Sequence, residues 1–240
     1  MMLDIADVVR KQIALYRAHD MRAERAQRAG RGTQDQLSFG PYLLISREKG
    51  AGGSVVGQLA GQRMSWQVFD AELVNAIAQQ ANVRRELIES LDERAREMIE
   101  EIVRGFLAPQ PIDTPGYLAS LREVVLTLGH QGNVVIVGRG AQYILPTQFG
   151  LRVRLVAPAE VRIRRIASAR QMSLKAAQME VESSDRERAR VVRRHYGREV
   201  HDPFNYDLII NTTELTVEAA AEITVAALHH KLTAHSKERR

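Results

Sequence analysis

A glycine-rich segment, residues 46–54, constrains this chain more than any other feature, because it lies between a strand pattern and a helix pattern. The apolar run 42–45 precedes it, and apolar residues at helical spacing follow it over 55–60. Glycine allows positive φ angles and close approach of backbone N–H groups to an anion, and the next helix N-terminus adds partial positive charge. The order of strand, glycine loop and helix therefore predicts a phosphate site, with a tight structural turn as the alternative.

The glycine loop departs from the phosphate-binding consensus G-x-x-x-x-G-K-[ST] at two positions. With Gly52 aligned on the second glycine, Arg47 stands in place of the first glycine and Gly53 in place of the lysine. Ser54 stands where the consensus hydroxyl binds magnesium. The loop thus keeps the second consensus glycine and the hydroxyl but lacks the consensus lysine.

The rest of the chain alternates between strand-length apolar runs and helical patterns. Such runs occur at 134–137, 151–156 and 208–210, with a weaker one near Val68 and Phe69. This alternation predicts a mostly parallel sheet covered by helices. We expect a helical insertion over residues 71–130, between the second and third strands. It includes helical segments at 86–106 and 117–128 and is broken by Pro109, Pro111 and Pro115.

The two ends of the chain predict helices that flank this core. Residues 3–19 carry an apolar stripe at helical spacing, made of Ile5, Val9, Ile13 and Tyr16. We expect a docking helix there, available for a homodimer contact, and a linker after it that completes an N-terminal extension over 1–36. The last helix starts near Thr216, a suitable N-cap, and residues 235–240 are predicted to be a disordered tail.

Composition removes several functional classes. The chain has no cysteine, which excludes disulfide scaffolds, thiolate metal sites and cysteine nucleophiles. It contains no G-x-S-x-G or H-E-x-x-H motif, which argues against serine and metal hydrolases. Asp4 and Asp7 stand where a secretory signal carries positive charge, and no apolar run approaches the roughly 20 residues of a membrane helix. We therefore expect a cytoplasmic protein without a membrane partner.

The positive charge of the chain is concentrated between residues 160 and 198. Eleven Lys or Arg and five acids lie there, a net charge of +6, whereas the whole chain carries +5. Such a stretch can hold nucleic acid, a membrane surface or a small phosphorylated ligand, or it can simply face solvent. No aromatic residue separates the arginines between 160 and 195, so single strands find no stacking platform. We expect no specific nucleic-acid partner.

Two further segments carry candidate ligand-binding arginines. Arg139 lies between glycines directly after an apolar strand, and ligands of open α/β sheets bind at such carboxyl ends. Its guanidinium suits a phosphate, or it caps a neighbouring helix. On the helix predicted after residue 183, Asp185 and Arg188 share one side. Another side of the same helix carries Arg186, Arg190, Arg193 and Arg194.

Six segments, in this order, resemble the cytidylate kinase-like proteins of the P-loop nucleoside monophosphate kinase group. They read ISREKGAGGSVVGQLA, FDAELV, VVIVGRGAQYIL, LRVRLVAPAEVRIRRI, SSDRERAR and DPFNYDLIINTTEL. The resemblance covers about residues 42–232 and implies a three-layer α/β P-loop NTPase fold with a five-stranded parallel sheet. Within a domain over 37–234 it implies that 71–130 is a monophosphate-binding insertion and 171–200 a lid.

The resemblance also implies substrates and sites. It implies an ATP-dependent kinase that acts on CMP or dCMP with Mg²⁺, and small-molecule nucleotides as partners. The residues expected to bind ATP are Arg47, Lys49, Gly50, Ala51, Gly52, Gly53 and Ser54, with Ser54 as the metal ligand. Those expected to bind the acceptor are Asp70, Arg139, Asp185 and Arg188. The lid arginines Arg186, Arg190 and Arg194 are expected to supply catalytic charge on closure, because phosphoryl transfer needs positioning and positive charge.

The sequence departs from the cytidylate kinases at three places, and two functional classes stay open. Gly140 replaces the Asp of their Gly-Arg-Asp, Val181 replaces an Arg, and Gly53 leaves the loop without its lysine. The first class is a kinase for a nucleoside monophosphate or another small phosphorylated metabolite. The second is a nucleotide-binding regulatory or interaction protein without turnover. The missing lysine favours this second class, whereas Ser54, Arg139, Asp185 and Arg188 favour the kinase.

Overall fold

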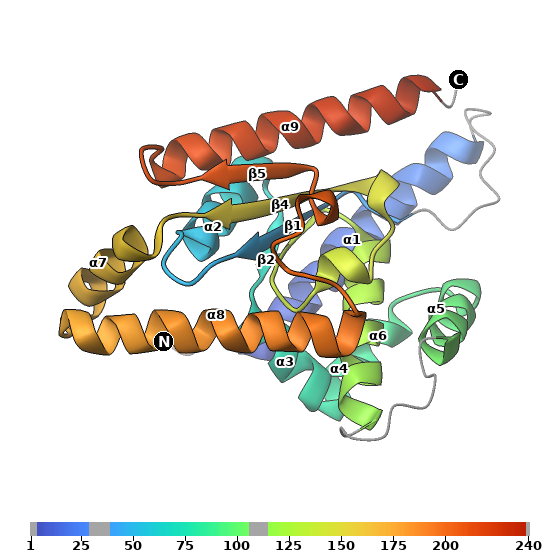
Figure 1. Ribbon diagram of the computed structural model, residues 1–240. Helices are drawn as coiled ribbons and strands as arrows, with labels where there is room; N and C mark the ends of the chain where they lie inside the picture. The colour runs from blue at the N-terminus through green and yellow to red at the C-terminus, as the bar shows by residue number, and fades with distance from the viewer. Residues whose placement is uncertain (1–3, 29–38, 106–114, 239–240) are drawn as a thin grey trace. The chain divides into compact units, whose positions relative to one another are not determined.

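The computed structural model describes residues 4–28, 39–105 and 115–238, which form two compact units. One unit contains the residues up to Pro41 and Ala71–Val134; the other contains Tyr42–Asp70 and the chain from Val135 onward. Figure 1 shows the elements of each unit. The glycine loop, the strand ends and the basic segment all belong to the second unit.

The second unit is built on a five-stranded parallel sheet with strand order β2-β3-β1-β4-β5. β1 pairs with β4 from Tyr42↔Gly150 to Arg47↔Leu155, and β4 pairs with β5. The predicted α/β fold is thereby confirmed, and strands occur at all the predicted places. The strands are β1 (Tyr42–Arg47), β2 (Gln67–Phe69), β3 (Val134–Val137), β4 (Gly150–Val156) and β5 (Leu208–Asn211).

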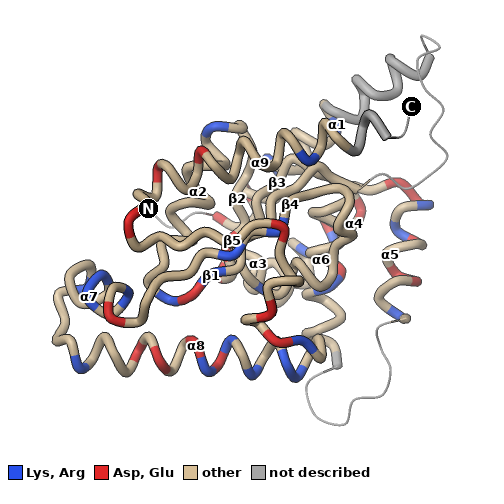
Figure 2. The backbone as a smooth tube through the Cα atoms, turned by 45° about the horizontal axis from the view of Figure 1, so that its top comes forward, with Lys and Arg blue, Asp and Glu red and all other residues tan. Residues whose placement is uncertain are grey.

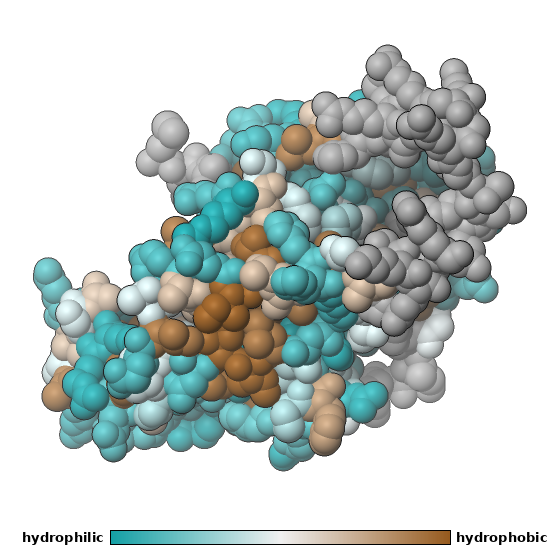
Figure 3. All heavy atoms as spheres, turned by 90° about the horizontal axis from the view of Figure 1, so that it is seen from above, coloured by the Kyte–Doolittle hydropathy of each residue, from teal (hydrophilic) through white to brown (hydrophobic). Residues whose placement is uncertain are grey.

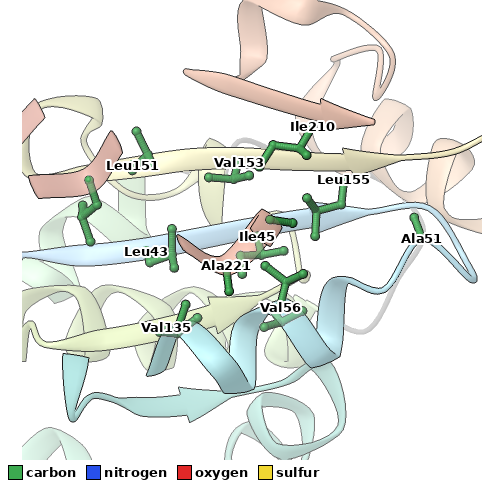
Figure 4. Packing of buried hydrophobic residues seen from close by; sticks show 14 residues of the cluster. Leu43, Ile45, Ala51, Val56, Val135, Leu151, Val153, Leu155, Ile210 and Ala221 are labelled. Atoms are coloured by element: carbon green, nitrogen blue, oxygen red, sulfur yellow. The ribbon is translucent and has the colours of Figure 1, made fainter. Parts of the chain in front are cut away.

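One face of the sheet packs against α2 (Gly53–Met64) and α9 (Val217–Glu238) in a continuous apolar cluster. Side chains of β1, β3, β4 and β5 meet those of the two helices there (Figure 4). The labelled members are Leu43, Ile45, Ala51, Val56, Val135, Leu151, Val153, Leu155, Ile210 and Ala221. Because successive strand residues point to opposite faces, the register partners Ser46 and Arg154 lie on the other face.

Two helices follow β4 and pack against each other: α7 (Ala159–Arg170) and α8 (Leu174–Tyr196). Ser173 caps α8, since its side chain accepts from the N–H of Ala176. Three short 3₁₀ helices lie in the connections: η1 (Ala141–Tyr143), η2 (Thr147–Phe149) and η3 (Pro203–Asn205). The predicted lid, residues 171–200, is therefore mostly one long helix.

The elements contained in the first unit are helices. It contains α1 (Ile5–Arg28), α3 (Ala71–Gln79), α4 (Ala81–Glu89), α5 (Glu93–Gly105) and α6 (Pro115–Gln131). α1 packs against α3 and α4, and Val9 and Ile13 of its apolar stripe are buried. The stripe is thus largely used within the chain, and a homodimer through this helix stays a prediction.

Helix boundaries differ from the sequence-based expectation at two places in this unit. α1 continues to Arg28, because residues 21–28 at the start of the predicted linker contain mainly Ala, Arg and Gln, which favour a helix without an apolar face. The helix expected over 86–106 is divided near Asp92, whose carboxylate accepts from the N–H of Ala95 at 2.7 Å and caps α5. Pro115 begins α6, while Pro109 and Pro111 lie outside the described residues.

The C-terminal helix begins as predicted and extends further. Thr216 Oγ1 accepts from the N–H of Ala219 at 3.2 Å, which confirms the N-cap. α9 continues through Glu238, into the segment predicted to be a disordered tail; residues 239–240 lie outside the described residues. The Asp207 carboxylate ties β5 to β4 and α9, since it accepts from Arg152 Nη2 at 2.8 Å and Lys231 Nζ at 2.7 Å.

The surface seen from above α9 carries a patch of apolar side chains near its middle (Figure 3). Ile209 of β5 and Ile223 of α9 are among the exposed large apolar residues of the chain. Over residues 4–28, 39–105 and 115–238, no helix combines the length and the apolarity that crossing a bilayer requires.

Candidate nucleotide-binding site

The glycine loop runs from Arg47 at the end of β1 to Gly53 at the start of α2, and it needs its glycines for two reasons. Gly50 and Gly52 have φ angles of +83° and +82°, a region that L residues rarely adopt. A Cβ at Gly50 would lie 2.8 Å from the carbonyl oxygen of Arg162, and one at Gly52 would lie 2.9 Å from Cγ1 of Val217. α2 then starts with no acidic residue in its first turn and no side-chain cap from Gly52. An uncapped helix N-terminus of this kind suits an anion such as phosphate.

Ser54 lies in the first turn of α2 and is exposed. Within the described part of the chain, no three His, Cys, Asp or Glu side chains form a group that could hold a metal ion. Mg²⁺ bound together with nucleotide phosphates needs only one or two protein oxygens, because phosphates and water complete its coordination. The exposed hydroxyl of Ser54 fits that mode of binding.

A group of buried charged side chains contacts the glycine loop, and the sequence analysis did not predict this group. Glu48 is 3.5 Å from Arg154 and 3.3 Å from Arg162, and both arginine side chains are less than a tenth exposed. Arg162 also donates to the carbonyl of Lys49 at 3.1 Å and to Asp185 at 2.6 Å. Two arginines thus meet two carboxylates, so the group is neutral overall and fixes the loop backbone.

Two carboxylates of α8 reach the glycine loop from the other side. Asp185 Oδ1 accepts from the backbone N–H of Lys49 at 3.2 Å, and Glu180 is 2.9 Å from Lys49 Nζ. The hydrogen bond from Lys49 holds the pKa of Glu180 below its ordinary value. In this structure, acidic groups therefore occupy donors of a loop that is suited to phosphate.

The other predicted residues of α8 divide between two sides of the helix. Arg188 faces the loop and donates to the carbonyl of Arg47 at 2.9 Å. Arg186, Arg190 and Arg194 are exposed, and Arg186 lies 3.6 Å from Glu182 on the same helix. The acidic residues of α8 lie in its middle, and its arginines lie from there toward its C-terminal end (Figure 2). The predicted separation of the two sides is present, with the predicted catalytic arginines on the solvent side.

The turn after β3 has an unusual backbone. Gly138, Arg139 and Gly140 have φ angles of +89°, +58° and +67°. A non-glycine residue in this region costs about 1 kcal/mol or more, and such strain often marks functional sites. The Tyr196 hydroxyl at the end of α8 donates to the Arg139 carbonyl at 2.9 Å. A Cβ at Gly140 would lie 2.6 Å from Cζ of Tyr196, so this tyrosine occupies the space that a side chain at position 140 would need.

The remaining predicted acceptor residue, Asp70, directly follows β2. Since β2 and β3 are neighbours in the sheet, Asp70 and Arg139 come from the carboxyl ends of adjacent strands. Near the end of β5, Thr212 is fully buried, and its hydroxyl donates to the carbonyl of Ala51 at 3.2 Å. Thr212 therefore supports the glycine loop, a role that its sequence motif did not indicate.

Comparison with known proteins agrees with this geometry. The model of the cytidylate kinase-like family matches residues 43–214, a span that contains the glycine loop, the β3 turn and α8. The chain belongs to the cytidylate kinase-like family. The cytidylate kinase of Sulfolobus acidocaldarius is 26% identical over 190 residues, which are 79% of this chain and 94% of that enzyme.

The chain is also similar to a second cytidylate kinase in sequence and to a solved structure in fold. The cytidylate kinase of Pyrococcus horikoshii is 34% identical over 100 residues, 42% of this chain, so the match spans about half of that enzyme (52%). An uncharacterized protein from Eubacterium ventriosum has a solved structure that aligns with a TM-score of 0.63 at 17% identity. The alignment covers 79% of this chain and 98% of that protein, which shows that the two proteins share a fold.

Proposed function

We propose that this member of the cytidylate kinase-like family is an ATP-dependent nucleoside monophosphate kinase with CMP or dCMP as acceptor. One observation carries the proposal: the glycine loop has two positive-φ glycines without room for a Cβ and opens directly into an uncapped helix N-terminus. That arrangement suits the phosphates of ATP. A cytoplasmic location and small-molecule partners are part of the proposal.

The reaction needs positioning more than covalent chemistry from the protein. The loop N–H groups hold the phosphates of ATP, and Ser54 would hold Mg²⁺, which supplies positive charge to the phosphate oxygens. An oxygen of the acceptor monophosphate forms a bond to the γ-phosphorus, and the bond to the β–γ bridging oxygen breaks to release ADP. The acceptor phosphate is already ionised near neutral pH, so no general base is required.

The acceptor and charge roles fall to residues from three elements. Asp70 and Arg139 follow the carboxyl ends of adjacent strands, where ligands of open α/β sheets bind. Asp185 and Arg188 contact the glycine loop in this structure, so their proposed role in acceptor binding requires α8 to move. The same movement would turn the exposed Arg186, Arg190 and Arg194 toward the transferred phosphoryl group.

A second candidate is a nucleotide-binding protein of the same family without turnover. The observation that favours it is the loop itself, because Gly53 replaces the lysine and carboxylates of α8 occupy loop donors. A kinase for another small phosphorylated metabolite is a third candidate, favoured by Tyr196, which occupies the space that a side chain at position 140 would need.

A coupled ADP-release assay across nucleoside monophosphates, with calorimetry of ATP binding, separates the first candidate from the other two. We expect turnover with CMP or dCMP in the parent protein, and loss of ATP binding in Gly52→Val. Because valine at this φ angle also strains the backbone, Ser54→Ala serves as a second variant whose exposed position leaves the fold intact. It should lower Mg²⁺-dependent turnover while ATP still binds without metal. ATP binding without turnover on any monophosphate would rule out the first candidate and leave the binding protein and the kinase for another metabolite.

A further inference from the structure

The position of the missing lysine is filled from elsewhere in the loop. Gly53 is not among the positive-φ glycines, so its backbone does not require glycine. A Cβ there would lie 2.5 Å from Cβ and 2.6 Å from Cγ of Arg47. The stem of Arg47 therefore lies across the position where the consensus places its lysine, and any larger residue at 53 would displace it.

The far end of the same side chain reaches the turn after β3. A Cβ at Gly138 would collide with Nη1 of Arg47 and would lie 3.1 Å from its Cζ. β3 is the neighbour of β1 in the sheet, so the guanidinium lies at the carboxyl edge between these two strands. Two glycines thus leave room for one arginine that extends from the glycine loop to the end of β3.

We propose that Arg47 supplies the positive charge that the consensus lysine would give to the β and γ phosphates of ATP. The inference rests on the proposed function and names the residue that completes its phosphate site. A guanidinium stays charged at any physiological pH and offers paired N–H donors that match two phosphate oxygens. The hydrogen bond from Arg188 to the Arg47 carbonyl fixes the backbone from which the side chain extends.

The other cations near the loop are placed less suitably. Lys49 is paired with Glu180, and Arg162 is buried against Glu48 and Asp185. The lid arginines lie on the solvent side of α8 and reach the phosphates only after the helix moves. Arg47 alone among these residues runs across the position of the lysine itself, so its contact with ATP precedes lid closure.

The first test removes the charge and keeps the stem. Arg47→Met should weaken ATP and ADP binding by at least about tenfold, the loss expected for a charge-assisted hydrogen bond. AMP binding should change little, because AMP has no β or γ phosphate. Calorimetry with the three nucleotides measures this pattern, and thermal unfolding of each variant controls for the fold. An equal loss for AMP and ATP, or no loss at all, would overturn the assignment.

The second test moves the charge back to its usual position. Gly53→Lys alone should lower the stability and ATP affinity, because the new side chain meets the Arg47 stem. The double variant Arg47→Gly with Gly53→Lys should recover at least about tenfold in ATP affinity over Arg47→Gly alone. If the parent binds ATP and neither this recovery nor the Arg47→Met loss appears, the inference fails and the proposed function stands. If the parent binds no ATP, the proposed function itself fails and takes the inference with it.

Discussion

The ion pair between Lys49 and Glu180 leads to a prediction about nucleotide affinity. The two charged groups are 2.9 Å apart, and their side chains are 24% and 25% exposed. A phosphate that reaches the glycine loop competes with the Glu180 carboxylate for the Lys49 ammonium. Glu180→Gln removes the competing charge and keeps the size of the side chain, so we expect ATP to bind more tightly to this variant.

The size of the effect follows from the burial of the pair. Exposed ion pairs contribute about 0–1 kcal/mol and hydrogen bonds to charged groups about 1.5–3 kcal/mol. Glu180 also pairs with the half-exposed Arg170, and this ion pair is present both with and without bound ATP. A net competition of about 1 kcal/mol is reasonable for a partly exposed pair, which corresponds to about a fivefold gain in affinity.

Titration calorimetry with ATP on the parent, Glu180→Gln, Lys49→Gln and the double variant measures the gain and its origin. In the Lys49→Gln background, Glu180→Gln should bring no further gain, because the competing cation is absent. Glu182→Gln is the matched control, since Glu182 lies on the same helix and pairs only loosely with the exposed Arg186. Unchanged or weaker ATP binding in Glu180→Gln, or the same gain without Lys49, would refute the reasoning.

Two further predictions concern stability. Asp207→Asn should lower the free energy of unfolding at pH 7 by about 2 kcal/mol in urea titrations, because Arg152 and Lys231 lose a shared, largely buried carboxylate. Burial alone would raise the pKa of Asp207, but these partners hold it below its ordinary value, so the parent loses this advantage as the pH falls through the lowered pKa. Gly140→Ala should cost about 1–2 kcal/mol in the same assay, because its Cβ meets the Tyr196 ring. In a Tyr196→Ala background, Gly140→Ala should lower the free energy of unfolding by less. An equal loss in both backgrounds would rule out the steric cause.

Much of the fold could be predicted from local sequence signals. The strands at 134–137 and 151–156 are apolar runs bounded by glycine or proline, and the Thr216 cap precedes a clear apolar face. The break near Asp92 also has a local signal, a side chain suited to cap the next helix, but the surrounding helical periodicity concealed it. Where the apolar stripe ended, intrinsic helix propensity extended α1 to Arg28.

The site was less predictable, because its key contacts join distant parts of the chain. Spacing alone places Asp185 and Arg188 on one side of a helix, but which side meets the glycine loop depends on how α7 and α8 pack. The burial of Arg154 has a partial signal, since it alternates with apolar residues in a strand. Nothing local shows that Arg162 belongs below the loop or that Tyr196 fills the space beside Gly140.

α8 contacts both the glycine loop and the turn after β3. Asp185 touches the loop and Tyr196 touches the Arg139 carbonyl, and the two residues are about 16 Å apart along one unbroken helix. A shift of α8 that frees the Lys49 N–H for ATP would therefore also withdraw the tyrosine from the Arg139 turn. Thermodynamic linkage makes such coupling reciprocal. An acceptor that binds better to the altered turn would raise the affinity for ATP, and ATP would raise the affinity for that acceptor by the same factor. The two substrates would then bind cooperatively through the movement of α8.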